Sequence, residues 1–334
     1  MNLMRSYIEE QPALARRMVD ERSALCADFL ARFTHTPVRR IILFGSGSSN
    51  HAARMAKPIL ERALGIEVTP IVPTRIHELD YVPEEGLFWF AISQSGISTN
   101  TYHLIRDLQS RSIPVAAITG GHDTPIAQCA DCSIALPCGE ENIGAKTKGQ
   151  VASALALILL GLEWGRARGT CPADFYTQMI DSLRTLGDQL DENLARSTVW
   201  CEDLLPKLAD APHLYVIAKG NAQGGAMEGA LKLLETIYRP VSYYEFEEYL
   251  HGIQNALDEK SWILMLMPDA DDPDHARALR LISFIESVGG HVLPISRGID
   301  TGITDSLTLP TAGNELLASL EYVLPLQLLS AELS

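Results

Sequence analysis

The chain alternates short apolar runs with helical stretches of about a dozen residues, and several of the runs end in glycine or serine. In the first half, the apolar runs lie at 39–49, 66–72, 87–96, 113–121 and 132–137. Strands that alternate with helices of this length form a parallel sheet with helices on its faces. The sequence therefore predicts an α/β fold in which each sheet is doubly wound.

The same pattern begins again about 173 residues later. The runs at 213–220, 261–269 and 291–298 match those at 39–49, 87–96 and 113–121, and a buried helix from Val151 and a polar helical stretch at 173–210 lie between the halves. We predict an N-terminal helical segment at 1–37, a first domain at 38–198, and a second of similar topology at 199–334, related by internal duplication.

Charge and composition limit the partners of the chain. Apolar residues make up 46% and charged residues 21%, which is typical of a folded globular protein. Lysine and arginine number 27 against 42 aspartates and glutamates, giving a net charge of −15. Such a charge repels nucleic acid and anionic membranes, so we expect neither as a partner. An anionic ligand would therefore need a local group of hydrogen-bond donors or positive charges to bind it.

The N-terminus lacks the pattern of a signal peptide, and the apolar run at 151–162 is shorter than the roughly 20 residues of a membrane helix. Six cysteines without an export signal indicate a reducing cytoplasm. Cys129, Cys132 and Cys138 could indicate a zinc or redox site, but no second CxxC and no histidine pair completes a ligand set. We interpret these cysteines as buried thiols and expect no metal.

Two strand ends in the first half carry the candidate ligand site, because ligands of open α/β sheets bind at the carboxyl ends of the strands. The segment 45–50, GSGSSN, has Asn50 where a dinucleotide fingerprint needs a third glycine, and the chain contains no P-loop. In the segment SQSGIST, Ser93, Ser95 and Ser98 surround a turn-forming glycine before a helix. Hydroxyls beside free helix N–H groups suit a phosphate monoester. The alternative is a serine-rich turn that caps the helix.

The equivalent strand of the second half ends in PDADDPD, whose aspartates would repel a phosphate. We therefore expect one phosphate site per chain. Glu228, Lys232 and Glu235 share one face of a predicted helix, either as catalytic groups or as an ordinary solvated face. The opposite face is apolar and comprises Ala230, Leu233, Leu234 and Ile237.

His251 follows Glu245, Glu247 and Glu248 in the segment YYEFEEYLHG. A histidine among carboxylates is either a catalytic group or a surface residue, and the spacing alone leaves both open.

Five motifs in order resemble the sugar isomerase (SIS) domain family, and specifically the two-domain isomerase portion of glucosamine-6-phosphate synthase. They are GSGSSNHAA, SQSGISTNT, ENIGAKTKG, AMEGALKLLE and EYLHGI, with EEQPAL near the start and YVLPLQLL near the end. The resemblance covers nearly the whole chain. It implies two flavodoxin-like SIS domains in tandem that bind a phosphosugar.

The resemblance also implies roles for individual residues. Phosphate ligands would be Ser49, Ser93, Gln94, Ser95 and Ser98, with Gly47, Lys146 and Thr147 as further substrate contacts. Glu235 would be the base that moves a proton between C1 and C2, and Glu228 and Lys232 would hold its conformation. His251 would open the sugar ring in the neighbouring subunit of a homodimer with shared sites, or of a higher oligomer.

Departures from the family motifs lie near the sugar. Lys146 replaces a serine of the family, Ile97 replaces a glutamate, and a C-terminal lysine tail is absent. The chain starts directly at the SIS portion, so we expect no internal source of ammonia.

Proteins of this architecture without a glutaminase domain resemble the fructosamine-6-phosphate deglycases, which cleave a 6-phosphorylated Amadori compound without a cofactor. That activity is our principal expectation. Glucosamine-6-phosphate deaminase and aldose/ketose phosphosugar isomerase are the enzymatic alternatives. A non-catalytic sugar-phosphate sensor is a further alternative, disfavoured because a sensor has no need of Glu235 and His251.

Overall fold

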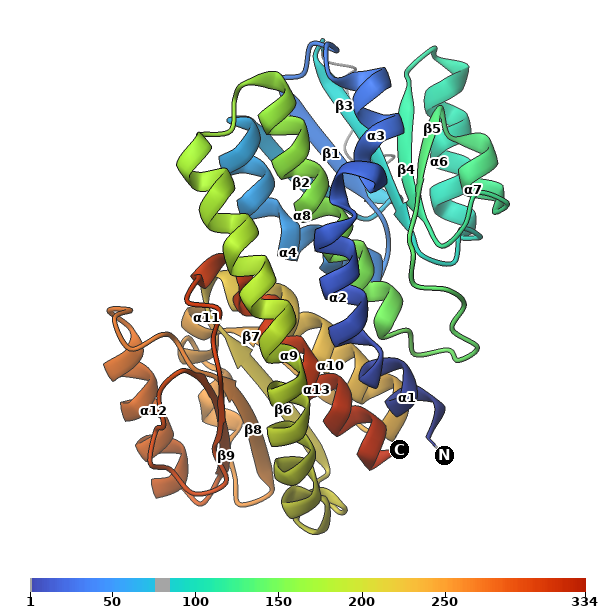
Figure 1. Cartoon of the computed structure of the whole chain (residues 1–334). Helices are drawn as coiled ribbons and strands as arrows, with labels where there is room; N and C mark the ends of the chain where they lie inside the picture. The colour runs from blue at the N-terminus through green and yellow to red at the C-terminus, as the bar shows by residue number, and fades with distance from the viewer. Residues whose placement is uncertain (1, 76–84) are drawn as a thin grey trace. The chain divides into compact units, whose positions relative to one another are not determined.

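Two parallel sheets, one in each half of the chain, form the framework of the protein (Figure 1). The computed structural model describes residues 2–75 and 85–334. Contacts divide the described chain into two compact units, Ala13–Arg184 and a second that joins Met1–Pro12 to Thr185–Ser334. The division at 184/185 and the boundary predicted at 198/199 both lie within the long helix α9 (Ala173–Leu208).

The unit Ala13–Arg184 contains the first sheet. Its elements are most of α2 (Gln11–Asp20), α3 (Arg22–Phe33), β1 (Arg40–Phe44), α4 (Ser48–Leu64), β2 (Glu67–Ile71), β3 (Leu87–Ser93), α6 (Thr99–Ser110), β4 (Val115–Thr119), α7 (Pro125–Cys129), β5 (Cys132–Ala135), α8 (Lys148–Arg168) and the first part of α9. Within the described residues, the strand order is β2-β1-β3-β4-β5, with every pair parallel. This is the flavodoxin-like order of a doubly wound sheet.

The apolar runs of this half are buried as the sequence predicts. From Phe88 to Ser93, strand β3 is buried on both faces, as expected of a central strand in a parallel sheet. Helix α8 is also buried, including all of 151–162, which confirms the predicted buried helix. Its apolar residues pack with α3 and α4 rather than forming a stripe toward solvent.

The second unit repeats this topology. Its elements are α1 (Leu3–Glu9), the remainder of α9, β6 (His213–Ala218), η1 (Gly220–Ala222), α10 (Gln223–Ile237), β7 (Val241–Glu245), α11 (Phe246–Leu250), η2 (Ile253–Ala256), β8 (Ser261–Leu266), α12 (His275–Ser287), β9 (His291–Arg297), β10 (Leu307–Leu309), η3 (Glu315–Leu317) and α13 (Ala318–Leu333). The order β10-β9-β8-β6-β7, with every pair parallel, is the first order read from the other edge. Two doubly wound parallel-sheet domains in tandem are therefore confirmed.

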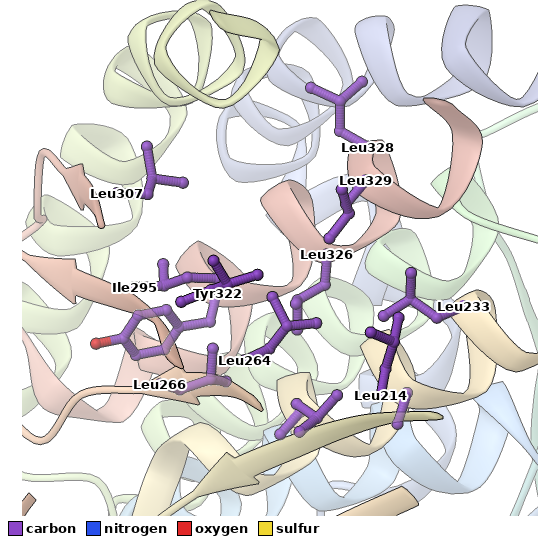
Figure 2. Packing of buried hydrophobic residues seen from close by; sticks show 14 of the residues in the cluster. Leu214, Leu233, Leu264, Leu266, Ile295, Leu307, Tyr322, Leu326, Leu328 and Leu329 are labelled. Atoms are coloured by element: carbon purple, nitrogen blue, oxygen red, sulfur yellow. The ribbon is translucent and has the colours of Figure 1, made fainter. Parts of the chain in front are cut away.

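Helix α13 is the central helix of the second unit. Figure 2 shows Tyr322, Leu326 and Leu329 of this helix among leucines from β6, β8 and α10. The described segment Glu315–Leu333 is long and apolar enough to cross a membrane by length and composition, but 83% of its apolar 18-residue window is buried inside the protein. Packing in the core thus accounts for its apolar sequence.

The N-terminal helix α1 belongs to the unit of the second sheet and lies beside α13, so both chain ends are together (Figure 1). Arg5 forms an ion pair of 2.7 Å with Glu332, and the Nε2 atom of Gln11 donates a buried hydrogen bond of 2.7 Å to Oε1 of Gln327. These contacts fix the first residues to the C-terminal helix.

Candidate functional site

The first sheet has its topological switch point between β1 and β3, which are adjacent and parallel with Phe44 opposite Ala91. Loops that leave two such strands diverge toward opposite faces and leave a crevice between them, where ligands of this fold bind. The segments 45–47 and 94–98 are these two loops. Ser93 is the last residue of β3, and the other predicted phosphate residues follow β1 or β3, the two strands that form the crevice.

The loop after β1 approaches β3 closely. A Cβ atom added at Gly45 would lie 2.7 Å from the carbonyl oxygen of Ile92 and 2.9 Å from the Cβ atom of Ser49, so only glycine fits there. Gly47 is exposed and directly precedes α4, and Ser49 lies in the first turn of α4. The close approach places Ser49 beside the end of β3.

The loop after β3 turns at Gly96, which has a φ of +67° and whose N–H donates to the carbonyl oxygen of Ser93 at 2.9 Å. Ser93 is buried, whereas Ser95 is exposed. Ser98 occupies the cap position of α6, but its side chain makes no capping hydrogen bond; its oxygen accepts one from Thr101 at 3.0 Å. The Ser98 hydroxyl therefore accepts no hydrogen bond from the first backbone N–H groups of α6. This favours the interpretation as an anion-binding site over that of a simple helix cap.

Lys146 and Thr147 lie just before α8, where the carboxylate of Glu141 occupies the helix start. Glu141 accepts hydrogen bonds from the backbone N–H groups of Thr147 and Lys148, each at 3.0 Å, and of Gly149 at 2.8 Å. The Thr147 hydroxyl donates to Glu141 at 3.2 Å, and the Lys146 ammonium donates to the backbone oxygen of Glu141. Both predicted substrate contacts therefore bind Glu141 in this structure.

The sequence analysis assigned no role to Glu141, although this residue is the first of the motif ENIGAKTKG. The physical signal in that motif is an acidic residue before a helix start, which is favourable. Glu141 lies six to eight residues before the N–H groups it binds, outside the three-residue spacing of a capping box. Only the folded loop shows the contact.

The switch point of the second sheet holds a cavity of about 260 Å³. Its cations are already paired: the Lys219 ammonium lies 2.6 Å from Asp272 and 2.7 Å from Asp274, and Arg297 bonds Asp269 and Glu321. Lys219 holds the pKa of Asp274 below its usual range. The charged residues that line the cavity are two cations, Lys219 and Arg297, and four acidic residues, Asp269, Asp271, Asp272 and Glu315. The three aspartates among them belong to the segment predicted to repel phosphate, and they outnumber the cations.

Helix α10 carries the predicted catalytic residues of the second unit. The Nζ atom of Lys232 lies 2.5 Å from Oε2 of Glu235 and 3.5 Å from Oε1 of Glu228. The side chains of Lys232 and Glu228 are 2% and 0% exposed, while that of Glu235 is 36% exposed. The solvated-face interpretation is therefore wrong for Glu228 and Lys232, because α10 packs between the sheet and α13. Leu234, expected on the apolar face, is 45% exposed.

His251 ends the short helix α11 on the surface of the second unit. Its ring nitrogen Nε2 lies 3.2 Å from Oε1 of Glu247, and 71% of its side chain is exposed. The carboxylate of Glu245 caps α11 by accepting hydrogen bonds from the N–H groups of Glu247 and Glu248. The surrounding acidic residues thus hold the helix and the ring.

The cysteines are free thiols, all six within the described part of the chain. Cys138 is buried as predicted, but Cys129 and Cys132 are only half-buried. Burial raises the pKa of all three thiols, so none is activated as a thiolate. Among residues 2–75 and 85–334, no group of three or more His, Cys, Asp or Glu side chains is arranged to hold a metal ion.

Comparison with known proteins identifies the class. Residues 36–162, which include the first sheet, match the SIS domain. The chain therefore contains a SIS domain and is homologous to the isomerase domain of glutamine–fructose-6-phosphate aminotransferases, which confirms the resemblance drawn from the five motifs.

The isomerizing glutamine–fructose-6-phosphate aminotransferase of Pseudomonas putida is 26% identical over 98% of this chain and 55% of its own length. The chain thus spans about half the length of the curated relatives it matches. A structure of a candidate phosphosugar isomerase from Clostridium difficile 630 is 28% identical, with a TM-score of 0.89 over 99% of this chain and 92% of that one. The C-terminal domain of the Francisella tularensis aminotransferase shares the fold at 21% identity, with a TM-score of 0.88 over 99% of this chain and 96% of that one.

Proposed function

We propose that this protein is a cofactor-independent deglycase that cleaves a 6-phosphofructosamine, such as fructose-lysine 6-phosphate, into a hexose 6-phosphate and a free amine. The observation that carries the proposal is the arrangement on α10, where a buried ammonium holds a half-exposed carboxylate, Glu235. A fixed carboxylate with access to solvent is suited to moving a proton on a bound sugar.

The loops after β1 and β3 supply the phosphate-binding role. Ser49, Ser95 and Ser98 offer hydroxyls, and the starts of α4 and α6 carry no capping bond from the residue that precedes each. Neutral donors and helix N–H groups bind a phosphate without a lysine, which suits a chain of net charge −15.

The reaction balances with these groups and one water. Glu235 removes a proton from C1 of the open-chain ketosamine; the C–H electrons form the C1–C2 double bond of an enolamine, and the C2 carbonyl oxygen takes up a proton and becomes a hydroxyl. The same carboxyl returns the first proton to C2, and the C1–C2 electrons form the new bond to that proton. The nitrogen lone pair forms the C1–N double bond of an imine as the N–H proton leaves, which replaces the proton taken up by the oxygen. Water adds to that imine and releases the amine and the aldehyde of the hexose 6-phosphate. No electron carrier takes part.

His251 is proposed to open the sugar ring, and the enzyme to be a homodimer in which this residue serves the neighbouring subunit. Its exposed ring is accessible on the surface of its own unit. The neighbouring Glu247 gives the ring a carboxylate partner that can hold its orientation.

The full activity of the aminotransferase relatives is not carried over, because this chain corresponds to about half of their length. Lys146 and Ile97 also depart from the motifs that surround the sugar in the family. We therefore expect the substrate of this protein to differ from that of the aminotransferases in its substituent at C1 or C2.

The deciding experiment incubates the purified protein with fructose-lysine 6-phosphate and with glucosamine 6-phosphate, in separate assays containing EDTA, and identifies the products. Glucose 6-phosphate and lysine in the first assay are expected. Ammonia from the second alone would identify a deaminase, ketose/aldose interconversion an isomerase, and tight binding without turnover a sensor. Glu235→Gln is the matched inactive control. A parallel assay without EDTA gives the comparison. Turnover that occurs without EDTA and is lost when EDTA is present would overturn cofactor independence.

A further inference from the structure

The carboxylate of Glu141 binds the start of α8 with both of its oxygens. Oε1 accepts from the N–H groups of Thr147 and Lys148 and from the Thr147 hydroxyl, and Oε2 accepts from the N–H of Gly149 at 2.8 Å. Glu141 is only 4% exposed. A buried negative charge at the N-terminus of a 21-residue helix is favourable and fixes the loop before it.

Gly149, the third residue of this arrangement, touches Gln94. A Cβ atom added at Gly149 would lie 2.5 Å from Cγ and 2.7 Å from Cδ of Gln94, and 2.8 Å from Oε2 of Glu141. The Gln94 side chain and the Glu141 carboxylate therefore meet at the same glycine. Replacing this glycine would displace one of the two.

The backbone of Gln94 is held from a different side by Gly120. The N–H of Gly120 donates to the carbonyl oxygen of Gln94 at 2.8 Å, and a Cβ atom added at Gly120 would lie 2.5 Å from that oxygen. Gln94 is thus fixed by contacts from the end of β4 and from the start of α8.

One end of the Gln94 amide has no partner. Its Oε1 atom is buried, and nothing in the described part of the chain donates to it. Buried polar atoms are nearly always hydrogen-bonded, and an amide oxygen can only accept, so this unpaired end is available to a hydroxyl group of the bound sugar rather than to its phosphate. Gln94 lies between Ser93 and Ser95, in the loop that carries the proposed phosphate site.

We propose that Glu141 is a positioning residue for the sugar phosphate site: it fixes the start of α8, and through Gly149 it fixes the Gln94 amide that contacts the ligand. The inference rests on the proposed function of the loop after β3. It assigns Thr147 to holding Glu141, rather than to contacting the sugar.

The first test measures binding of glucose 6-phosphate by calorimetry to Gly149→Ala and to Gly161→Ala. Both variants add one methyl group to α8, but at Gly161 the three atoms nearest to the new Cβ all belong to Leu60. Gly149→Ala is expected to weaken binding by up to about tenfold, the scale of one neutral hydrogen bond. Gly161→Ala is expected to bind as the parent protein does. Equal affinities for all three proteins would overturn the proposal.

A double variant shows whether the effect passes through Gln94. If it does, adding Gly149→Ala to Gln94→Ala causes no further loss, because the displaced group is already absent. A loss of the same size in both backgrounds would show that Gly149 acts elsewhere. Full affinity in Gln94→Ala, with weakened binding in Ser95→Ala, would overturn this inference and leave the phosphate site intact. Full affinity in both would overturn the proposed function as well.

Glu141→Gln tests the carboxylate and covers the case in which Gly149→Ala fails to fold. The amide oxygen of the new side chain can replace Oε1, but its NH₂ group would face the Gly149 N–H, so only that contact is lost. We expect weaker binding of glucose 6-phosphate and no further loss in a Gln94→Ala background. Unchanged binding in a folded Glu141→Gln protein would contradict the proposal.

Discussion

The ammonium of Lys232 lies 2.5 Å from a carboxylate oxygen of Glu235, and the two residues are one helical turn apart on α10. The other neighbour of this ammonium, Glu228, is fully buried. One buried cation therefore neutralises a buried carboxylate and restrains a second one that reaches solvent. The catalytic proposal and the stability of the second unit depend on the same side chain.

Replacing Lys232 with methionine is expected to destabilise the protein by about 3–5 kcal/mol, because the buried Glu228 charge would lose its cation. Urea unfolding followed by circular dichroism measures the change. Glu235→Gln is the control, since it leaves the Glu228–Lys232 pair intact and should cost much less. Equal losses in the two variants would contradict the distinction.

Glu235→Gln is expected to lower turnover of fructose-lysine 6-phosphate by at least about 10²- to 10⁴-fold, the usual contribution of a general base. The isosteric amide cannot take the C1 proton, yet it can still accept a hydrogen bond from Lys232. Affinity for glucose 6-phosphate, measured by calorimetry, should persist. Full turnover in this variant would exclude Glu235 as the base.

Ser95→Ala should weaken binding of glucose 6-phosphate but not of unphosphorylated glucose. Ser95 is exposed in the loop after β3, so the change removes a hydroxyl that would donate a hydrogen bond to the phosphate, without disturbing the core. Titration calorimetry with the two sugars makes the comparison. The same affinity as the parent protein for the phosphorylated sugar would count against this loop.

Gly96→Ala should be more destabilising than Gly65→Ala. Both glycines have positive φ angles, +67° and +69°, so the conformational cost of about 1 kcal/mol is shared. Only at Gly96 does the new Cβ meet other atoms, 2.3 Å from Cβ of Thr124, whereas at Gly65 nothing lies within 4 Å. Thermal unfolding of the two variants gives the difference, and equal melting temperatures would refute it.

Mixing inactive Glu235→Gln subunits with inactive His251→Ala subunits should restore part of the activity, because a mixed dimer contains one site with both intact groups. Turnover is measured after dissociation and reassociation of the two variants, and each variant treated alone is the control. Failure to recover activity, although mixed dimers form, would show that each site uses residues of a single chain.

Much of the architecture could be predicted from the sequence. Apolar runs that end in glycine or serine mark the parallel strands, and the repeat at about 173 residues marks the second sheet of the same strand order. These patterns are local in the sequence. The right-handed connection between parallel strands then restricts the strand orders that the chain can adopt. The helix at 151–162 was predictable because every residue of it is apolar or small.

The candidate site was harder to predict, because long-range packing decides it. The spacing of Glu228 and Lys232 gives a shared face, but only the packing of α10 against α13 shows that this face is buried. Leu234 follows the apolar pattern and is nevertheless exposed. The contact of Glu141 with α8 spans an irregular loop, for which no periodicity exists.

The two sheets share one strand order but end in chemically opposite loops, glycines and hydroxyls after β1 and β3, and paired ions after β6 and β8. Under the proposed function, only the loops after β1 and β3 need to bind the phosphate. The loops after β6 and β8 are then free of that requirement, so substitutions there should change phosphate affinity less than substitutions at 93–98 do.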